Sequence, residues 1–205
     1  MRLPVIPTLL WLLALPSVGT GQTVSWPADP PSHQLTSDRR QAPQCGSATP
    51  SITASSLGPI SVGMALRDVR SRCPQLLYAW LILEGDPEPV AVVRFGSVEA
   101  LLEFADTLPT TPVYRISTRS AAARTADSVG PGTPVAELAR RLGPLEFALG
   151  EGRLFAIPRE HAGYSFELLV PGEWDWDRIL RVQRTGDLRL LPAGTRVAAI
   201  VIIGP

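Results

Sequence analysis

The sequence contains no lysine and no asparagine, so all nineteen of its Lys and Arg residues are arginines. Without lysine the chain has neither a Schiff-base amine nor a phosphate-loop lysine, and without asparagine it carries no asparagine-linked glycan. Because the codons for both residues are AT-rich, their absence indicates a gene from a GC-rich bacterial genome. Nineteen acidic residues balance the arginines, and this neutrality argues against nucleic acid as a partner.

Sequence motifs that carry enzymatic chemistry are also missing. The chain has no Gly-x-Ser-x-Gly, His-Glu-x-x-His or paired Cys-x-x-Cys, the patterns of the serine-hydrolase elbow and of common zinc sites. His161 follows a proline-containing stretch, which indicates that it lies in a loop. This interpretation is preferred to a role as general base or ligand. Carboxylates for glycoside hydrolysis would come from Glu146, Glu151 or Glu167, whose spacing gives no geometry. We therefore expect no catalytic residue, no metal site and no cofactor.

No apolar run is long enough to span a bilayer, which takes about 20 residues. The run from Val5 to Val18 follows Arg2 and is interrupted by Pro7 and Pro16, which is typical of a cleaved export signal. The small residues Gly19 and Gly21 indicate cleavage near the Gly21–Gln22 bond, so residues 1–21 form the expected signal peptide. An uncleaved anchor is the alternative. We expect the mature protein to be periplasmic or secreted, with no integral membrane segment.

Residues 22–55 are rich in Pro, Ser, Thr, Gln and Asp and are predicted to be a disordered linker, because such a segment buries too little apolar surface to offset its ordering entropy. The chain has two cysteines, Cys45 and Cys73, and an exported protein meets conditions that permit a disulfide. Cys73 lies on the expected core face of a helix, so a Cys45–Cys73 bridge would tie the end of the linker to that helix. Two free thiols are the alternative, and a redox role is disfavoured.

A glycine turn that leads into a short amphipathic helix occurs twice in the rest of the chain. The first begins at Gly63 and the second at Gly132, 69 positions later, and this alignment pairs Asp68 with Glu137. Apolar residues at i, i+3 and i+7 predict one buried stripe on each helix. Thr133 is the expected N-cap of the second helix.

Segments of strand length follow each predicted helix. The expected strands are 76–83, 90–95, 98–104 and 113–118 after the first helix, and 145–149, 153–157, 164–170 and 197–202 after the second. Segment 98–104 alternates in strand fashion but could also be helical. The last segment is a continuous apolar run, so we expect it to be covered on both faces.

These patterns predict an α+β fold in which two tandem helix-plus-antiparallel-meander repeats pack as one domain. The first repeat spans residues 56–124 and the second spans residues 125–205. The second repeat carries an insertion that contains Trp174, Asp175, Trp176 and Asp177. Because tryptophan is enriched at the centres of protein interfaces, these four residues are the candidate binding site. The alternative is that one or both tryptophans cover the core of the sheet.

The entry from Gly63-Met64 into a helix that bears Asp68-Val69 resembles the SmpA/OmlA (BamE-type) family of envelope domains. The second unit carries the match on Gly132-Thr133, Glu137-Leu138 and Gly143. Two such units in tandem are similar to the beta-lactamase inhibitory protein family. The resemblance implies an alpha-beta repeat fold and protein binding without catalysis, and it transfers neither a partner nor a binding residue. The chain departs from the family in lacking a lipidation cysteine and in carrying the insertion.

Together these observations favour a non-enzymatic protein-binding module whose partner is an envelope or secreted protein. The alternative function is that of a small hydrolase or a small-ligand-binding protein that uses the region around His161. The sequence does not indicate an oligomeric state.

Overall fold

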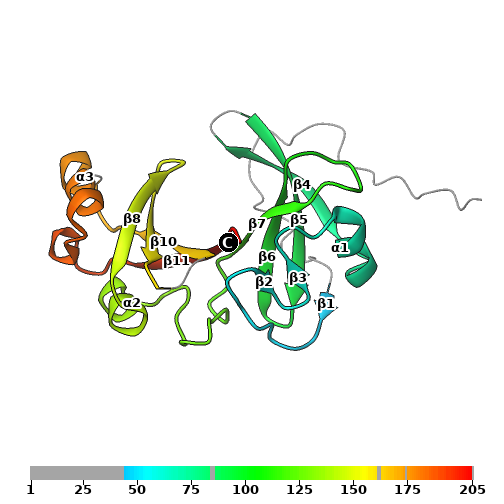
Figure 1. Cartoon of the computed structure of the whole chain (residues 1–205), viewed down its shortest axis with the longest axis horizontal. Coiled ribbons are helices and arrows are strands. Elements are labelled where there is room, and N and C mark those ends of the chain that lie inside the picture. Colours follow the sequence, from blue (N-terminus) through cyan, green and yellow to red (C-terminus); the bar gives the residue numbers. More distant parts are fainter. Residues whose placement is uncertain (1–43, 84–85, 161–162, 174, 205) are drawn as a thin grey trace, which may run out of the picture.

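The computed structural model describes residues 44–83, 86–160, 163–173 and 175–204 (Figure 1). The helices are α1 (Leu66–Arg72), α2 (Val135–Leu142) and α3 (Trp176–Thr185), and the short 3-10 helix η2 (Leu188–Leu190) follows α3. The strands are β1 (Gln44–Gly46), β2 (Ser56–Leu57), β3 (Ile60–Ser61), β4 (Leu77–Leu83), β5 (Asp86–Phe95), β6 (Val98–Phe104), β7 (Val113–Thr118), β8 (Leu145–Gly150), β9 (Arg153–Pro158), β10 (Tyr164–Leu169) and β11 (Arg196–Ile202).

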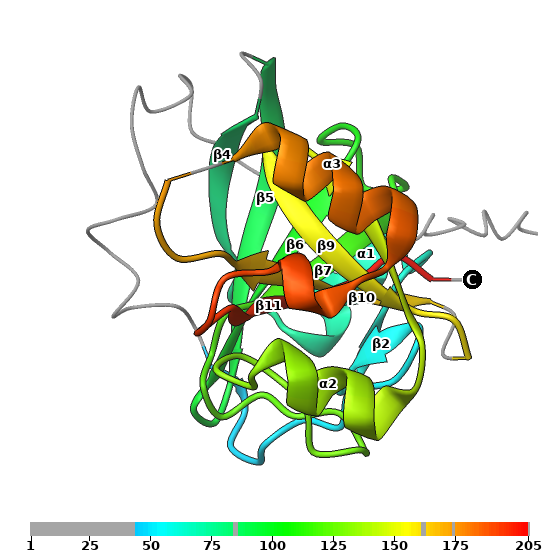
Figure 2. The ribbon, with the colours of Figure 1, turned by 90° about the vertical axis from the view of Figure 1, so that its left-hand side faces the viewer.

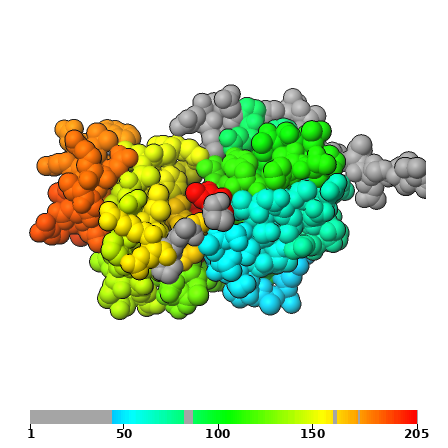
Figure 3. Space-filling model, viewed as in Figure 1, coloured from blue at the N-terminus to red at the C-terminus, as the bar shows by residue number. Residues whose placement is uncertain are grey.

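Nine of these strands form one sheet in the order β1-β5-β6-β7-β11-β10-β9-β8, with β4 paired to β5 as well. β1 and β5 are parallel, and the other pairs are antiparallel. The halves of the sheet meet where β7 pairs with β11, with Ser117 opposite Val201. In Figure 1, β4 to β7 lie on one side of this junction and β8 to β10 on the other. The space-filling view shows the C-terminal residues at the boundary between the two halves (Figure 3).

The prediction of an α+β tandem repeat is wrong. The fold is mostly β: strand residues outnumber helical residues by more than two to one, and the strands belong to a single mixed sheet with three helices. The helices span only 7, 8 and 10 residues. Because the last strand of each predicted unit pairs with the other, the segments merge into one continuous sheet. The parallel strand β1 comes from the predicted linker and has no counterpart in the second half.

All eight expected strand segments are strands in the structure, with bounds that differ by one residue or none except in β5, which begins four residues earlier than expected. Segment 98–104, which could have been helical, is β6, because it pairs with β5 on one side and β7 on the other. The C-terminal segment is β11, between β7 and β10, and five of its residues are buried. A central strand has neighbours along both edges, and its faces are covered by side chains from both halves of the sheet. The continuous apolar run of β11 is therefore explained by its central position.

The glycine turns at Gly63 and Gly132 adopt the same local structure. Both glycines have a positive φ, 84° and 91°, a region that side chains other than glycine rarely occupy. Gly63 N–H donates to the carbonyl of Val113 at 2.8 Å, and Gly132 N–H donates to that of Val197 at 2.8 Å. Each turn therefore fixes the start of its helix against one of the two strands that join the halves of the sheet.

The prediction that Thr133 caps α2 is wrong. The N-cap is Pro134, which makes no side-chain capping bond, and Thr133 Oγ1 instead accepts from Gly130 N–H at 3.1 Å. The carbonyl of Thr133 accepts from Val197 N–H, so this residue is held in extended pairing with β11 and lies before the cap position. The stop at Gly143 is confirmed, with a φ of 77° at the C-cap.

All three helices contribute to one hydrophobic core. They supply Leu66 and Val69 from α1, Leu138 from α2, and Ile179 and Val182 from α3, all of which are buried. These side chains pack against the same face of the sheet, which presents alternate residues of β6, β7 and β11 such as Leu102, Ile116 and Ile200. α2 and α3 lie at the same end of the molecule, seen end-on in Figure 2. Burial of each large aliphatic side chain stabilises the fold by about 1.5–3 kcal/mol.

The prediction of a disordered linker up to residue 55 is wrong for residues 44–55, which belong to the fold. β1 pairs with β5, and Ile52 is buried in the core. The predicted Cys45–Cys73 disulfide is present, with 4.9 Å between the Cα atoms, and it ties β1 to the end of α1. These contacts offset the ordering entropy of a polar segment. The expected signal at 1–21 and residues 22–43 of the linker lie outside the described residues.

The disulfide closes a loop across 28 positions of sequence, and removing it should destabilise the protein by about 3–4 kcal/mol because the unfolded chain gains entropy. We expect dithiothreitol to lower the midpoint of urea unfolding of the wild-type protein, followed by tryptophan fluorescence. The Cys45→Ser/Cys73→Ser variant should start at that lower midpoint and show no response to the reductant. An equal midpoint with and without reductant in the wild type would contradict this prediction.

Candidate functional site

One face of the sheet is not covered by any helix of the described residues, and we call it the open face. Cross-strand register defines it: Leu101 lies opposite Ser117, which lies opposite Val201, and the side chains at paired positions point the same way. Along each strand these residues alternate with the core residues. Ala199 and Val201 are buried but lie outside the hydrophobic core cluster, so other side chains of the open face must cover them.

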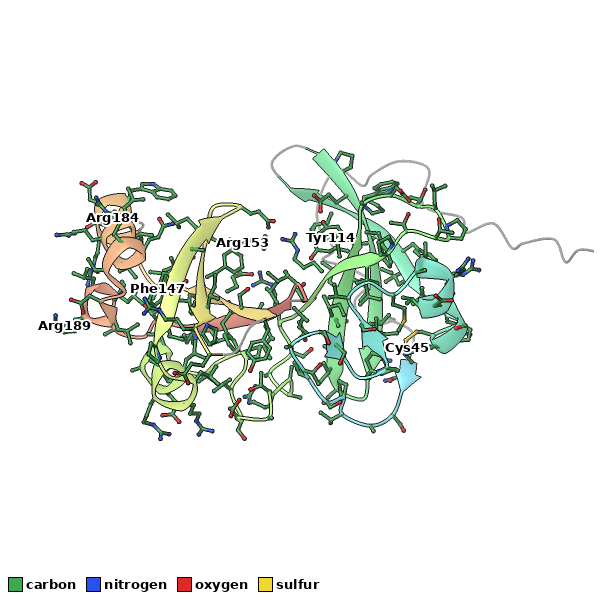
Figure 4. The ribbon with its side chains drawn as sticks, in the orientation of Figure 1. Cys45, Tyr114, Phe147, Arg153, Arg184 and Arg189 are labelled. Carbon is green, nitrogen blue, oxygen red and sulfur yellow. A yellow bond between two sulfur atoms is a disulfide. The ribbon has the colours of Figure 1, made fainter. Side chains whose placement is uncertain are left out.

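A cleft of about 170 Å³ crosses the open face above the junction of β7 and β11. Its apolar lining consists of Leu81, Leu101, Phe155, Ala199 and Val201. Its charged lining consists of Glu103, Arg115, Arg119, Glu151, Arg153 and Glu167, which come from β6, β7, β9, β10 and the adjoining turns. Figure 4 shows Arg153 and Tyr114 on its two sides. The cleft therefore combines an apolar floor with three cations and three anions.

Arg115 is the central cation of the cleft. Its Nε and Nη2 donate to the same carboxylate oxygen of Glu103 at 2.8 and 2.5 Å, and its Nη1 donates to Glu151 at 2.7 Å. The side chains of Arg115 and Glu103 are 18% and 3% exposed, so this pair is largely removed from water. Glu151 lies in the two-residue turn between β8 and β9 and has a φ of 54°, uncommon for a residue with a side chain. The turn thus brings a carboxylate from β8–β9 to a cation on β7.

A second group of charges surrounds Glu167 on β10. Nη2 of Arg119 donates to both carboxylate oxygens of Glu167, at 2.7 and 2.5 Å. Nη1 of Arg153 lies 3.5 Å from Glu167 Oε2 and 4.0 Å from an oxygen of Glu151. Arg153 therefore bridges the two groups of charges, but at longer distances than Arg115 and Arg119 make to their partners.

Burial raises the pKa of two titratable side chains at the cleft, Glu103 and Tyr114. Burial raises the pKa of Glu103, and the hydrogen bonds from Arg115 offset only part of that rise. Burial and then a hydrogen bond to Glu88 raise the pKa of Tyr114 well above its usual value. The hydroxyl of Tyr114 is therefore protonated at physiological pH and donates to Glu88, with Glu103 3.4 Å away. On the acidic side of the cleft the carboxylate of Glu103 is thus enclosed by neighbouring side chains, among them Arg115 and Tyr114.

The structure separates the sequence-predicted site from this cleft. Trp174 lies outside the described residues. Asp175 is the N-cap of α3 and accepts from Arg178 N–H at 3.0 Å, Trp176 is the first residue of the helix, and Asp177 is exposed in its first turn. α3 contacts β8 and lies beyond that strand, away from the junction of β7 and β11 (Figure 1). Trp176 is 55% exposed, and Leu180, one turn later, is 39% exposed, so Trp176 does not belong to the core.

The other residues singled out in the sequence have mixed outcomes. His161 lies outside the described residues. Glu151 and Glu167 both line the cleft, whereas Glu146 is exposed and pairs with Arg159 at 3.1 Å, away from the cleft lining. Among the described residues, no group of histidine, cysteine, aspartate and glutamate side chains is arranged to hold a metal ion.

The charged residues Glu103, Arg115, Arg119 and Arg153 were missed as site residues from the sequence. A signal was present, because Glu103 and Arg115 fall at interior positions of segments predicted as strands. In a strand with neighbours on both sides, an interior charge must pair with another or face water. Identifying the pairs requires the register that sets Glu103 opposite Arg115, and that register depends on the order of strands in the sheet.

No family model matches the sequence, and no curated protein matches it. The chain is similar to a solved structure described as the uncharacterized protein yfeY from Escherichia coli. The two are 16% identical, with a TM-score of 0.47, and the match covers 75% of this chain and 99% of the other. These comparisons leave the resemblance to SmpA/OmlA domains as a prediction.

None of the helices in the described part of the chain has the length and apolarity to cross a membrane. The Cys45–Cys73 disulfide is compatible with an exported protein. The periplasmic or secreted location is still a prediction.

Breaking the central ion pair should destabilise the fold. Arg115→Leu leaves the carboxylate of Glu103 buried without its partner, and we expect a loss of about 3 kcal/mol in the free energy of unfolding, measured by urea titration. The Glu103→Leu/Arg115→Leu variant removes both charges and should regain most of that loss. A double variant no more stable than Arg115→Leu would contradict this account.

The exposure of Trp176 predicts a small effect on stability. Trp176→Ala should change the free energy of unfolding by less than about 0.5 kcal/mol, as is usual for exposed positions. Ile179→Ala, three residues along the same helix but only 2% exposed, should cost about 2–4 kcal/mol because it leaves a cavity. Equal losses in the two variants, measured by urea unfolding, would instead assign Trp176 to the core.

Proposed function

We propose that this protein is a non-enzymatic protein-binding module that is exported to the bacterial envelope or the secreted space. The proposed binding surface is the open face of the sheet, centred on the charged cleft. One observation carries the proposal: partly exposed apolar side chains and fixed arginines share a concave sheet face that no helix of the described residues covers. A helix or a second sheet usually packs against such a face, and here a partner protein would take that place.

The composition of the cleft supports a protein partner. Interface centres are enriched in aromatic residues and arginine, and the cleft has Phe155 beside Arg115, Arg119 and Arg153. Fixed ion pairs hold these arginines in place before binding, so less side-chain entropy is lost when a partner docks. Alternating charges also reject partners that present the wrong sign at the wrong position. The open face therefore offers both affinity and selectivity.

The segment 174–177 at the start of α3 is the alternative binding surface. Trp176 and Leu180 lie one helical turn apart on the exposed side of α3, and large exposed apolar side chains of this kind are common in interfaces. Because α3 lies beyond β8, away from the junction of β7 and β11 at which the cleft lies, the two surfaces can be tested separately (Figure 1).

The test uses the tagged protein exported by its native cells, chemical cross-linking in place, and mass spectrometry of the proteins that are retained. A protein cross-linked to the wild type would then be purified, and its affinity measured by calorimetry. Phe155→Gln should weaken that affinity at least about tenfold, equivalent to 1.4 kcal/mol, because it removes apolar area from the proposed surface. Leu180→Gln, a matched change on α3, should leave the affinity within about twofold.

Both variants would first be checked for native unfolding midpoints in urea. A loss confined to Leu180→Gln would move the binding surface to α3 and overturn the assignment of the open face. The absence of any cross-linked partner in both the envelope and the secreted fractions would count against a protein-binding function.

A further inference from the structure

The cleft has a recognition preference that its charge and exposure define. We infer that it receives an acidic side chain of the partner protein, held by the guanidinium groups of Arg119 and Arg153. This inference rests on the proposed function, because it names the chemistry of the partner at the same surface. It requires that the two arginines be accessible, close together and only partly used by their present contacts.

The two arginines converge on one carboxylate. Terminal nitrogens of Arg119 and Arg153 lie within about 6 Å of each other, because they are 2.5 and 3.5 Å from the same oxygen of Glu167. Both side chains are open to water, with exposures of 50% and 39%, whereas Glu167 between them is 10% exposed. A group that enters the cleft at this point therefore meets cations first.

Most of the donors of these arginines are unused. A guanidinium carries five N–H bonds in a rigid fork. Within the described residues, Arg119 contacts Glu167 through Nη2 alone, and Arg153 contacts Glu167 and Glu151 through Nη1 alone. Each arginine can therefore donate to a second carboxylate while it still donates to Glu167. A charge-assisted hydrogen bond of this kind is stronger than a neutral one.

The distribution of charge selects an anion over a cation. Around Glu167 two arginines face one carboxylate, so this half of the cleft is positive. Around Arg115 one cation faces Glu103 and Glu151, so that half is negative, but these two carboxylates are only 3% and 26% exposed, against 50% and 39% for Arg119 and Arg153. The positive half is thus the accessible one.

The size of the cleft favours a side chain over a free small molecule. Its volume of about 170 Å³ is below the roughly 300–1,000 Å³ of most small-molecule sites. A glutamate or aspartate presented on the surface of a partner would place its carboxylate between the arginines. Its methylene groups and its neighbours would then lie against Phe155 and Leu81.

The inference can be tested with a capped residue as the probe. The full-length protein, labelled with nitrogen-15, would be titrated with N-acetylglutamate N-methylamide and, separately, with the glutamine analogue, while the arginine Nε–H signals are followed by NMR. We expect the glutamate probe to shift the signals of Arg119 and Arg153 with a millimolar dissociation constant. The uncharged analogue should bind at least about fivefold more weakly because it lacks the charge-assisted pair.

Matched variants locate the effect. Arg153→Gln should weaken the glutamate probe at least about fivefold, whereas Arg140→Gln, which removes an exposed arginine from an ion pair on α2, should change nothing. Arg153→Lys keeps the charge but loses the fork, and intermediate binding is expected. If Arg153→Gln lowers the urea midpoint, the comparison of Arg153→Lys with the wild type decides instead. Equal binding of the two probes, or an equal loss in Arg140→Gln, would overturn the inference.

The purified partner separates this inference from the proposed function. A partner whose affinity falls with Phe155→Gln but is unchanged by Arg153→Gln would overturn the acidic anchor and leave protein binding by the open face intact. A partner that loses affinity with both variants supports both proposals. Free glutamate or another small carboxylate that binds more tightly than the capped residue would show that the source is a small molecule, and would also overturn the inference.

Discussion

The antiparallel pairing of β7 with β11 is the constraint on which the rest of the structure depends. It joins strands whose sequence positions are about 80 residues apart, Ser117 and Val201 among them, and turns two groups of strands into one sheet. Both glycine turns that start α1 and α2 are hydrogen-bonded to residues at or beside these strands. The cleft lies above the same junction, so its shape is set by the angle at which the two halves meet.

The charges of the cleft impose a second constraint, because they lie beside buried apolar residues. Taking Arg115 and Glu103 out of water is unfavourable unless the pair is retained in good geometry, and a hydrophobic pair would fill the same space at no loss of stability. The fold contains instead a chain of six charges, each held by at least one partner of opposite sign. Such an arrangement is expected where a surface must fix the position of charges for recognition, and it ties the halves of the sheet together through Glu151.

Much of the local structure could be predicted from the sequence, and little of the site. Alternation in segment 98–104, the apolar run of β11, the stop at Gly143 and the Cys45–Cys73 bridge all follow from period, burial and spacing, which are local properties. The tandem repeat was wrong because local similarity at Gly63 and Gly132 does not specify which strands pair. Arg115 and Arg153 were missed for the same reason: their importance comes from partners on other strands.

For Trp176 the sequence showed the residue type but not its position. Tryptophan is common in interfaces, but only the fold shows that its helix lies away from the cleft.

The position of β11 has a consequence for the order in which the chain is assembled. The strand formed by the last residues of the chain is not added to an edge but fills the middle of the sheet, between β7 and β10. Until those residues are available, the two flanking strands each present an open edge, and the long-range contacts across the junction cannot form. A chain that emerges from the ribosome N-terminus first therefore cannot complete this sheet before residues 196–202 have emerged. The two halves of the sheet therefore stay separate until β11 pairs with both β7 and β10, however early each half has formed its own local pairs.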